Sequence, residues 1–463
     1  MLFNSLEYIV FLPIVFLLYW FIKHVTKNDS QQIKLQNWFI IIVSYFFYAC
    51  WDARFLVLIL VTTCCSYYSG LLINSATKEC YKKLYLICNV VVNLLILGVC
   101  KYYDFFVQSF AELFDINTES LLLNIVLPVG ISFYTFQALS YSIDVYRKRI
   151  CATREFAAFG AYISFFPQLV AGPIERAENL LPQFLDKRDF DYKQAVYGMR
   201  LMLWGFFKKI VIADNCGIYV DSVWNDYTSQ SSATLLLAAV LFSMQIYADF
   251  SGYSDIAIGT ARLFGIRLSD NFNSPYFAQN IADFWRRWHI SLTSWFRDYV
   301  YIPLGGNRKG KWQTIINTLI VFSLCGLWHG ANWTFVVWGI YNALLFVPMI
   351  WLKSHKKANA STERREWYKV IATFVLVALG WIIFRAPSMA ECVGYIQALG
   401  RCDFSSIWIE NIFQMICLVM AIVVLLVFEW KKYLPNRWWV YYVLLFFIWW
   451  FAGQDVDFIY FQF

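Results

Sequence analysis

Apolar runs recur from one end of the chain to the other, and this repetition limits the possible fold more than any other feature. A helix that spans a bilayer needs about 20 mainly apolar residues. The runs are Ile9–Ile22, Trp38–Trp51, Phe55–Ile73, Leu84–Cys100, Leu121–Tyr141, Phe156–Ala171, Ala233–Tyr247, Ile315–Leu327, Thr334–Trp351, Val370–Phe384, Ile412–Phe428 and Trp438–Phe451. Some contain polar or helix-breaking residues, so we expect about 11 spanning or partly inserted helices.

The composition excludes a soluble globular protein. Hydrophobic residues make up 60% of the chain and charged residues only 15%, whereas soluble domains carry about 25% charged residues. The first apolar run leads directly into further runs, so we interpret it as a retained helix and not as a cleaved signal peptide. We expect an all-α polytopic membrane protein in which 1–463 is one domain, with N-terminal helices (1–120), a motif-bearing core (121–352) and C-terminal helices with an aromatic tail (353–463).

Lysine and arginine are unevenly distributed among the loops. The basic clusters lie at 23–34, 78–83, 147–154, 308–311, 353–369 and 431–437, while Asp104–Ser120 has no basic residue and Ala386–Glu410 has only Arg401. Basic loops face the cytoplasm in most membrane proteins. The pattern therefore predicts that both termini are extracytoplasmic.

Two of the four histidines lie in tryptophan-rich segments. His329 ends the apolar run Thr318–Leu327, and an ionisable residue in such a place is costly to bury and is usually functional. Burial should also keep its imidazole neutral, as a general base near pH 7 requires. The alternative is a structural histidine that bonds to a neighbouring helix.

The second histidine, His289, follows Arg286 and Arg287 in a segment rich in tryptophan and arginine. That combination is typical of a membrane interface, so we place the segment at or just inside the cytoplasmic surface. Arginine forks also suit phosphate groups, so His289 is either a site-supporting residue near an anionic donor or an interfacial anchor.

Several sequence blocks carry a resemblance to a known family. In order, they are Pro167–Ile174 with Leu181–Phe184, Asp249-Phe-Ser-Gly-Tyr-Ser-Asp255, Asn271–Tyr276, Phe284-Trp-Arg-Arg-Trp-His-Ile-Ser-Leu292, Tyr299–Gly306, Gly326-Leu-Trp-His-Gly330 and Phe384-Arg-Ala386. From about residue 125 onward the chain resembles the membrane-bound O-acyltransferase superfamily, within it the bacterial alginate O-acetyltransferase-like branch. A lone Leu-Trp-His would be weak, but the ordered set is specific.

This resemblance implies a ring of tilted helices around a tunnel, with His329 inside and His289 toward the cytoplasmic mouth. It implies that an acyl thioester such as acetyl-CoA enters from the cytoplasm of a bacterial cell and that the acyl group leaves on the outer side. It also implies an extracytoplasmic SGNH-type partner that completes O-acylation of an extracellular polysaccharide or peptidoglycan. A sister branch transfers D-alanine to teichoic acids.

The C-terminal segment Phe458-Ile-Tyr-Phe-Gln-Phe463 follows the charged break Gln454–Asp457. One interpretation is a hydrophobic tail in the outer headgroup region. The other is an acyl relay, because aromatic tails with a tyrosine resemble those of acyl-relay systems. Tyr460 would then take the acyl group from the thioester, since an aryl ester keeps much of the transfer potential of a thioester.

The other candidate site residues are polar or aromatic members of the same blocks, expected to line the tunnel or to contact substrate. They are Asp249, Ser251, Tyr253, Asp255, Asn273, Trp285, Arg286, Arg287, Trp328 and Asn332. The two aspartates fit tunnel architecture better than catalytic acids, because polar groups at membrane depth face an interior. Trp328 and Asn332 either line the tunnel or only pack. No metal-ligand spacing and no P-loop pattern is present, so we expect no metal and no bound cofactor.

We therefore interpret the chain as an acetyltransferase of the bacterial cytoplasmic membrane. Within the family, the alternatives are transfer of another acyl group, such as D-alanine from a carrier protein, or a lipid acceptor. A different class, a transporter or flippase without covalent chemistry, predicts internal repeats. The blocks around His289 and His329 each occur once, which argues against that class.

Overall fold

All regular secondary structure in the described part of the chain is helical. The computed structural model describes residues 1, 3–117, 120–169, 172–352, 366–431, 437–453 and 458–459. Seven helical segments there are long and apolar enough to cross a membrane: Leu6–Val25, Asp29–Ser75, Glu79–Phe114, Ser232–Leu263, Trp333–Trp351, Trp367–Arg385 and Ile412–Lys431. The predicted all-α multi-pass membrane protein is confirmed, while the expected number of about 11 helices is not.

The difference in number arises where apolar runs are broken or short. In the run Leu121–Tyr141, helix α6 (Ile131–Tyr146) begins only after Pro128 and Gly130. Proline lacks a backbone N–H, and Gly130 has a left-handed φ of 73°, which glycine adopts without strain. The run Phe156–Ala171 is likewise divided, into α7 (Phe156–Ser164) and α8 (Phe166–Leu169). Hydropathy alone does not reveal such breaks.

The chain forms two compact units with three boundaries: one inside α10 (Tyr192–Phe206), one inside α12 (Ser232–Leu263) and one after α12, between Ser269 and Asp270. Unit 1 comprises Met1–Met202 and Tyr253–Ser269. Its helices are α1 (Leu6–Val25), α2 (Asp29–Asp52), α3 (Leu56–Ser75), α4 (Glu79–Leu97), α5 (Tyr103–Phe114), α6, α7, α8 and α9 (Ala177–Leu185), with parts of α10 and α12.

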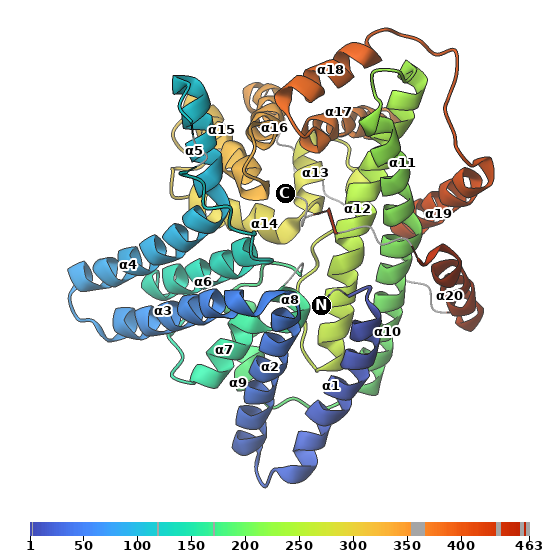
Figure 1. The fold of residues 1–463 in the computed structure, drawn as a ribbon. Helices are drawn as coiled ribbons and strands as arrows, with labels where there is room; N and C mark the ends of the chain where they lie inside the picture. The colour runs from blue at the N-terminus through green and yellow to red at the C-terminus, as the bar shows by residue number, and fades with distance from the viewer. Residues whose placement is uncertain are drawn as a thin grey trace. The chain divides into compact units, whose positions relative to one another are not determined.

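Helix α6 is the centre of unit 1, because nearly all of its side chains are buried and it packs against α3 and α4 (Figure 1). Its polar side chains find partners inside the bundle. Asn89 donates from Nδ2 to Ser142 Oγ at 2.9 Å, and Gln137 accepts from Gln168 Nε2 at 2.6 Å. Such partners are needed because an unpaired polar group costs free energy at this depth.

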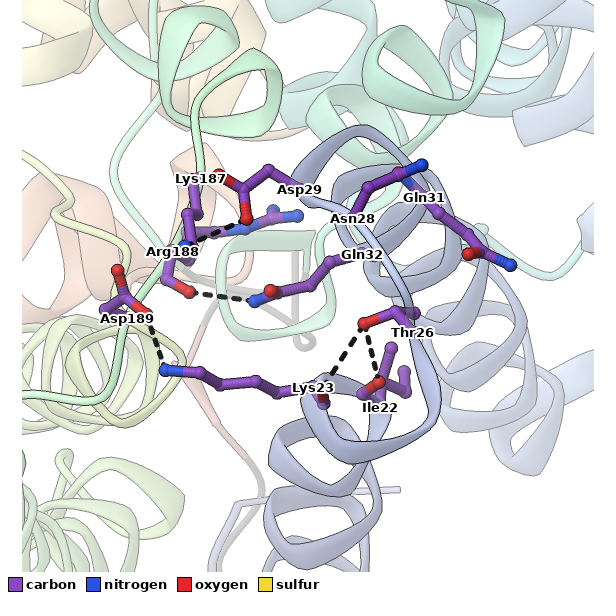
Figure 2. A network of polar contacts seen from close by, with 10 residues as sticks. All are labelled: Ile22, Lys23, Thr26, Asn28, Asp29, Gln31, Gln32, Lys187, Arg188 and Asp189. Carbon is purple, nitrogen blue, oxygen red and sulfur yellow. Dashed lines mark hydrogen bonds and ion pairs between the residues drawn. The ribbon is translucent and has the colours of Figure 1, made fainter.

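A polar network ties the α1–α2 hairpin to the loop after α9 within unit 1 (Figure 2). Gln32 donates from Nε2 to the carbonyl of Arg188 at 3.2 Å. An ion pair between Lys187 and Asp29, 2.9 Å long, lies beside it. The hairpin is thereby joined to a segment more than a hundred residues away in the sequence.

Unit 2 comprises Leu203–Gly252 and Asp270–Phe463 and contains both tryptophan-flanked histidines. Besides parts of α10 and α12, its elements are the π-helical segment η3 (Phe207–Ala213), α11 (Asp214–Asn225), η4 (Pro275–Phe277), α13 (Ile281–Arg287), α14 (Ile290–Phe296), the π-helical segment η5 (Arg297–Tyr301), α15 (Lys311–His329), α16 (Trp333–Trp351), α17 (Trp367–Arg385), α18 (Met389–Leu399), α19 (Ile412–Lys431) and α20 (Trp438–Phe451). At 7 residues each, α13 and α14 are only about 10 Å long and cannot span a bilayer of about 30 Å. Helices of this length suit the segment around His289, which the sequence places at or just inside the membrane surface.

Candidate active site

His329 is the last residue of α15 and lies inside an aromatic cage. Only 4% of its surface is exposed. Its ring is edge-on to Trp338 of α16 at a centroid distance of 5.2 Å and to Phe384 of α17 at 5.3 Å. The predicted burial is therefore confirmed, and three helices provide the surroundings of this imidazole.

Two glycines allow α15 and α16 to approach closely enough to build this cage. A Cβ on Gly326 would lie 2.1 Å from the carbonyl oxygen of Phe335, and one on Gly339 would lie 2.2 Å from that of Phe322. Both obstacles are backbone atoms, so no side-chain rotation relieves them. The crossing of these two helices thus fixes the end of α15, where His329 lies.

Replacing Gly339 by alanine should therefore destabilise unit 2 by more than the about 1–3 kcal/mol typical of an overpacked core. We expect a lower melting temperature of the purified protein in detergent, or loss of accumulation. Gly98→Ala is the matched control, because a Cβ at helical Gly98 meets no atom within 4 Å. Equal stability of the two variants would contradict the proposed helix crossing.

His289 is also almost completely buried, with 1% of its surface exposed. It precedes α14 and adopts a left-handed backbone conformation with a φ of 41°. A non-glycine residue in this region is strained and depends on the surrounding structure to hold it. An interfacial anchor would keep part of its ring accessible, so burial favours the interpretation of His289 as a site-supporting residue.

Asn271 sets the orientation and the tautomer of His289. Its Oδ1 lies 3.1 Å from Nδ1 of His289 and also accepts hydrogen bonds from Ser291, from Oγ at 2.9 Å and from the backbone N–H at 3.3 Å. Because an amide oxygen only accepts, the proton of a neutral His289 is on Nδ1, and Nε2 is the basic nitrogen. Burial lowers the pKa of His289 to about 3, so the ring is neutral at pH 7.

Trp328 brings the two histidines into one cluster. Its ring centroid is 5.8 Å from that of His289 and 5.0 Å from that of His329, and both contacts are edge-on. The resemblance assigns His289 to the cytoplasmic mouth and His329 to the tunnel interior. In the structure, a single indole contacts both rings.

The remaining tryptophans extend the cage. Trp285 of α13 is buried and contacts Trp338 at a centroid distance of 5.7 Å, and Trp338 stacks on Trp381 of α17 at the same distance. These rings extend the apolar surface around His329, and an apolar site of low dielectric constant strengthens the electrostatic interactions of any reacting group inside it.

The predicted arginines do not converge on the histidines. Arg286 is exposed and donates from Nε to the carbonyl of Ala282 in its own helix at 3.1 Å. Arg287 pairs with Asp283, one turn earlier, at 3.0 Å. Their side chains are thus held along α13, on a different face from the buried Trp285.

The two predicted asparagines have structural contacts. Asn273 is exposed, and its backbone N–H donates to the carbonyl of Arg287 at 2.9 Å. Asn332 caps α16 by accepting from the N–H of Thr334 at 3.0 Å, and its Nδ2 donates to the carbonyl of Pro387 at 2.7 Å. For Asn332 this agrees with the packing alternative left open by the sequence.

The block Asp249–Asp255 is divided between the two units. Asp249 and Ser251 are buried in unit 2, whereas Tyr253 and Asp255 belong to unit 1. Tyr253 is buried and donates to Asn4 Oδ1 at 3.3 Å, and Asp255 is partly exposed. The block therefore does not form one site within either unit.

The end of the chain is only partly described, and Tyr460 lies outside the described residues. Phe458 and Ile459 are fully buried in unit 2, with 0% and 2% of their surfaces exposed. These two residues therefore pack against the protein, and both interpretations of the tail, the outer headgroup region and the acyl relay, stay predictions. They are buried because the backbone N–H of Ile459 and the ring of Phe458 contact residues of α12. The apolar sequence alone does not show these contacts.

Sequence reasoning missed three important polar residues. The first is Asn271, which appeared only as the first residue of the motif block Asn271–Tyr276. The others are Lys209 and Asp214, which form a buried ion pair of 2.8 Å. The signal for the pair was present, because Lys208 and Lys209 interrupt the apolar segment Trp204–Ala213. Within the described residues there is no group of three or more His, Cys, Asp or Glu side chains that would hold a metal ion.

Comparison with known proteins identifies the family of the chain. Residues 38–389 match the model of the MBOAT, membrane-bound O-acyltransferase family, and the chain belongs to this family. It is 35% identical to the peptidoglycan O-acetyltransferase of Helicobacter pylori over 86% of this chain and 80% of that protein. It is 38% identical to the probable alginate O-acetylase AlgI of Pseudomonas aeruginosa over 86% of this chain and 77% of that protein.

A more distant relative is the teichoic acid D-alanyltransferase of Bacillus subtilis, at 28% identity over 56% of this chain and 69% of that protein. Family and relatives together identify the chain as a membrane-bound acyltransferase enzyme. The two relatives with the higher identities are named a peptidoglycan O-acetyltransferase and a probable alginate O-acetylase.

Proposed function

We propose that the protein takes an acetyl group from a cytoplasmic thioester, acetyl-CoA, and delivers it for O-acetylation of a cell-surface glycan. The observation that carries this proposal is the buried cluster of His329, Trp328 and His289 in a chain whose relatives are named O-acetyltransferases. A polysaccharide such as alginate and peptidoglycan are both acceptors compatible with these relatives.

His329 is the general base of the proposed reaction. A hydroxyl oxygen attacks the thioester carbonyl while its proton moves to the imidazole; the carbon–sulfur bond breaks as the ester bond forms. The imidazolium then gives the proton to the thiolate that leaves. An imidazole in an apolar cage suits both steps, because the ring accepts a proton on one nitrogen and then returns it to the leaving group.

His289 supports this reaction. Asn271 holds its ring with the proton on Nδ1, so the basic Nε2 is available to orient a donor group or a hydroxyl. Its ring contacts Trp328, which also contacts His329, so a group bound beside this indole would lie near both histidines.

The attacking hydroxyl, in this proposal, is the phenol of Tyr460. The acyl group then leaves the tail as an aryl ester, and an extracytoplasmic SGNH-type partner transfers it to the polymer. This route moves a small acyl group across the bacterial cytoplasmic membrane while the thioester donor stays inside. The burial of the tail residues Phe458 and Ile459 in the unit that holds both histidines supports it.

A second candidate is transfer of D-alanine, favoured by the similarity to the Bacillus subtilis D-alanyltransferase. Mass spectrometry of surface glycans distinguishes the two. A deletion strain should lack acetyl esters that return with the wild-type gene but not with a His329→Ala gene. Esters of D-alanine in their place would support the second candidate, and unchanged glycans would overturn both.

The membrane orientation is a separate prediction, based on the positive-inside rule. With Cys392 and Cys402 replaced, a membrane-impermeant thiol reagent should label a cysteine at Ser405 in intact spheroplasts and should not label one at Asn359. The cysteine at Asn359 should react once the membrane is permeabilised. Labelling of Asn359 alone in intact spheroplasts would invert the topology and exclude an extracytoplasmic tail.

A further inference from the structure

A lysine between two aspartates is buried in unit 2. Nζ of Lys209, in η3, lies 2.8 Å from Oδ1 of Asp214 at the start of α11 and 3.0 Å from Oδ1 of Asp249 in α12. The three residues are 0%, 4% and 2% exposed. None of them takes part in the histidine cluster.

Such a group of charges needs an explanation other than stability. Removing charges from water costs as much as their mutual attraction returns, so a buried ion pair gives little net stability over an apolar core. The lysine also lies in a π-helical segment, a rare feature that occurs frequently at functional sites. Both observations point to a role for the network beyond holding helices together.

The network extends to the C-terminal tail. The other carboxylate oxygen of Asp249, Oδ2, accepts a hydrogen bond of 2.7 Å from the backbone N–H of Ile459. The next residue of α12, Phe250, contacts Phe458 at a ring-centroid distance of 6.2 Å. Two consecutive helix residues thus hold two consecutive tail residues.

The helices that lead to the tail also pack on this network. Both α19 and α20 contact η3, the segment that carries Lys209. The lysine therefore fixes Asp249 from one side, and Asp249 in turn fixes the tail amide. A hydrogen bond to an ionised carboxylate is about twice as strong as a neutral one.

We propose that Lys209, Asp214 and Asp249 form a seat for the C-terminal tail, and that Asp249 is a positioning residue for acyl transfer. The proposal rests on the proposed function, because Tyr460 follows directly on the seated Ile459. Consecutive Cα atoms are about 3.8 Å apart, so fixing Ile459 limits where the next residue can lie. The seat would hold the residue before the acceptor tyrosine in a fixed place in the unit that carries the base.

The first test measures the seat itself, in the full-length protein with Ile459 replaced by cysteine. The backbone N–H remains in this variant, and its maleimide reactivity is read from the C-terminal peptide by mass spectrometry. Asp249→Asn and Asp249→Leu have similar shape and both remove the charge, but only leucine removes the acceptor. We expect about 10- to 100-fold faster labelling with leucine than with asparagine, as loss of one strong hydrogen bond predicts.

Asp221→Ala is the control, because Asp221 pairs with Arg385 in the same unit and has no recorded contact with the described tail residues Phe458 and Ile459. It should label at the rate of the Ile459→Cys parent. Equal labelling rates for the asparagine and leucine variants would overturn the seat.

The second test leaves the ion network intact and so covers the case in which Asp249 variants fail to fold. Ile459→Pro removes the donating N–H, and Ile459→Val keeps it. The proline variant should show a kcat lowered about 10- to 100-fold with an unchanged KM for acetyl-CoA, and the valine variant should resemble wild type. A wild-type kcat in the proline variant would refute the positioning role.

The two proposals fail separately. Tyr460→Phe should leave the labelling of Ile459→Cys unchanged, because the seat does not involve the phenol. Protected labelling in an enzyme whose activity survives Tyr460→Phe would keep the seat and exclude the relay. Fast labelling in every variant, with activity lost in Tyr460→Phe, would keep the relay and exclude the seat.

Discussion

Replacing His329 by alanine is expected to lower acyl transfer by about 10²- to 10⁴-fold, the range for loss of a general base. The protein should still accumulate in the membrane. His329 makes edge-on ring contacts with Trp338 and Phe384, and α15 is held mainly by its glycine crossing with α16. The rate is measured with purified protein and acetyl-CoA, and the amount of folded protein by size-exclusion chromatography.

His289→Ala is the comparison that gives this result its meaning. We expect a milder loss, expressed mainly as a higher KM for the donor, because His289 supports the site without accepting the proton. Complete loss of activity with normal accumulation would instead make His289 catalytic. Full activity of the His329→Ala enzyme would exclude His329 from the mechanism.

Replacing Tyr460 by phenylalanine is expected to abolish surface acylation although the change removes a single oxygen. The aromatic ring is kept, so its apolar contribution to stability is retained. Incubation with radiolabelled acetyl-CoA should yield an acylated C-terminal peptide from the wild-type protein. The Tyr460→Phe and His329→Ala proteins should yield none, the first for want of the acceptor and the second for want of the base.

A tail with only a structural role predicts a different pattern. Tyr460→Phe would then acylate at the wild-type rate, and deletion of Phe458–Phe463 would only lower stability. Because Phe458 and Ile459 are buried, that deletion should be more destabilising than removal of a surface tail. Normal acylation by the Tyr460→Phe enzyme would leave direct transfer from the donor to the partner's nucleophile.

The sequence predicts the class of fold and singles out His329 as a buried candidate site residue, because both inferences depend on local chemistry. Recurrent apolar runs of this length are stable as membrane helices, in which the backbone groups hydrogen-bond to one another. Burying an imidazole at the end of one run costs free energy, and ionisable residues in such places are usually functional. The ordered motif blocks add the family. The helix count was less predictable, because a proline, a left-handed glycine or a short run can break an apolar stretch without changing its hydropathy.

The site was only partly predictable, because the sequence does not show which side chains point toward one another. Arg286 and Arg287 adjoin His289 in the sequence, yet a helical turn directs their side chains along α13, away from the cage. Asn271, eighteen residues before His289, is the residue that orients it. The sequence neighbours of this histidine are therefore not the side chains that hold it, because a side chain's direction depends on the helical face that carries it.

The sequence by itself determined the environment of the helices, because a chain with these apolar runs must place them in a membrane. It also predicted that His329 is buried. Only the tertiary structure decided that one indole, Trp328, contacts both histidines, and that Asp249 holds the amide of Ile459, 210 residues away. The physical reason is that apolar pattern specifies which residues are buried but not which buried residues meet. Close helix crossings and hydrogen bonds between distant segments make that choice, and they exist only once the chain is packed.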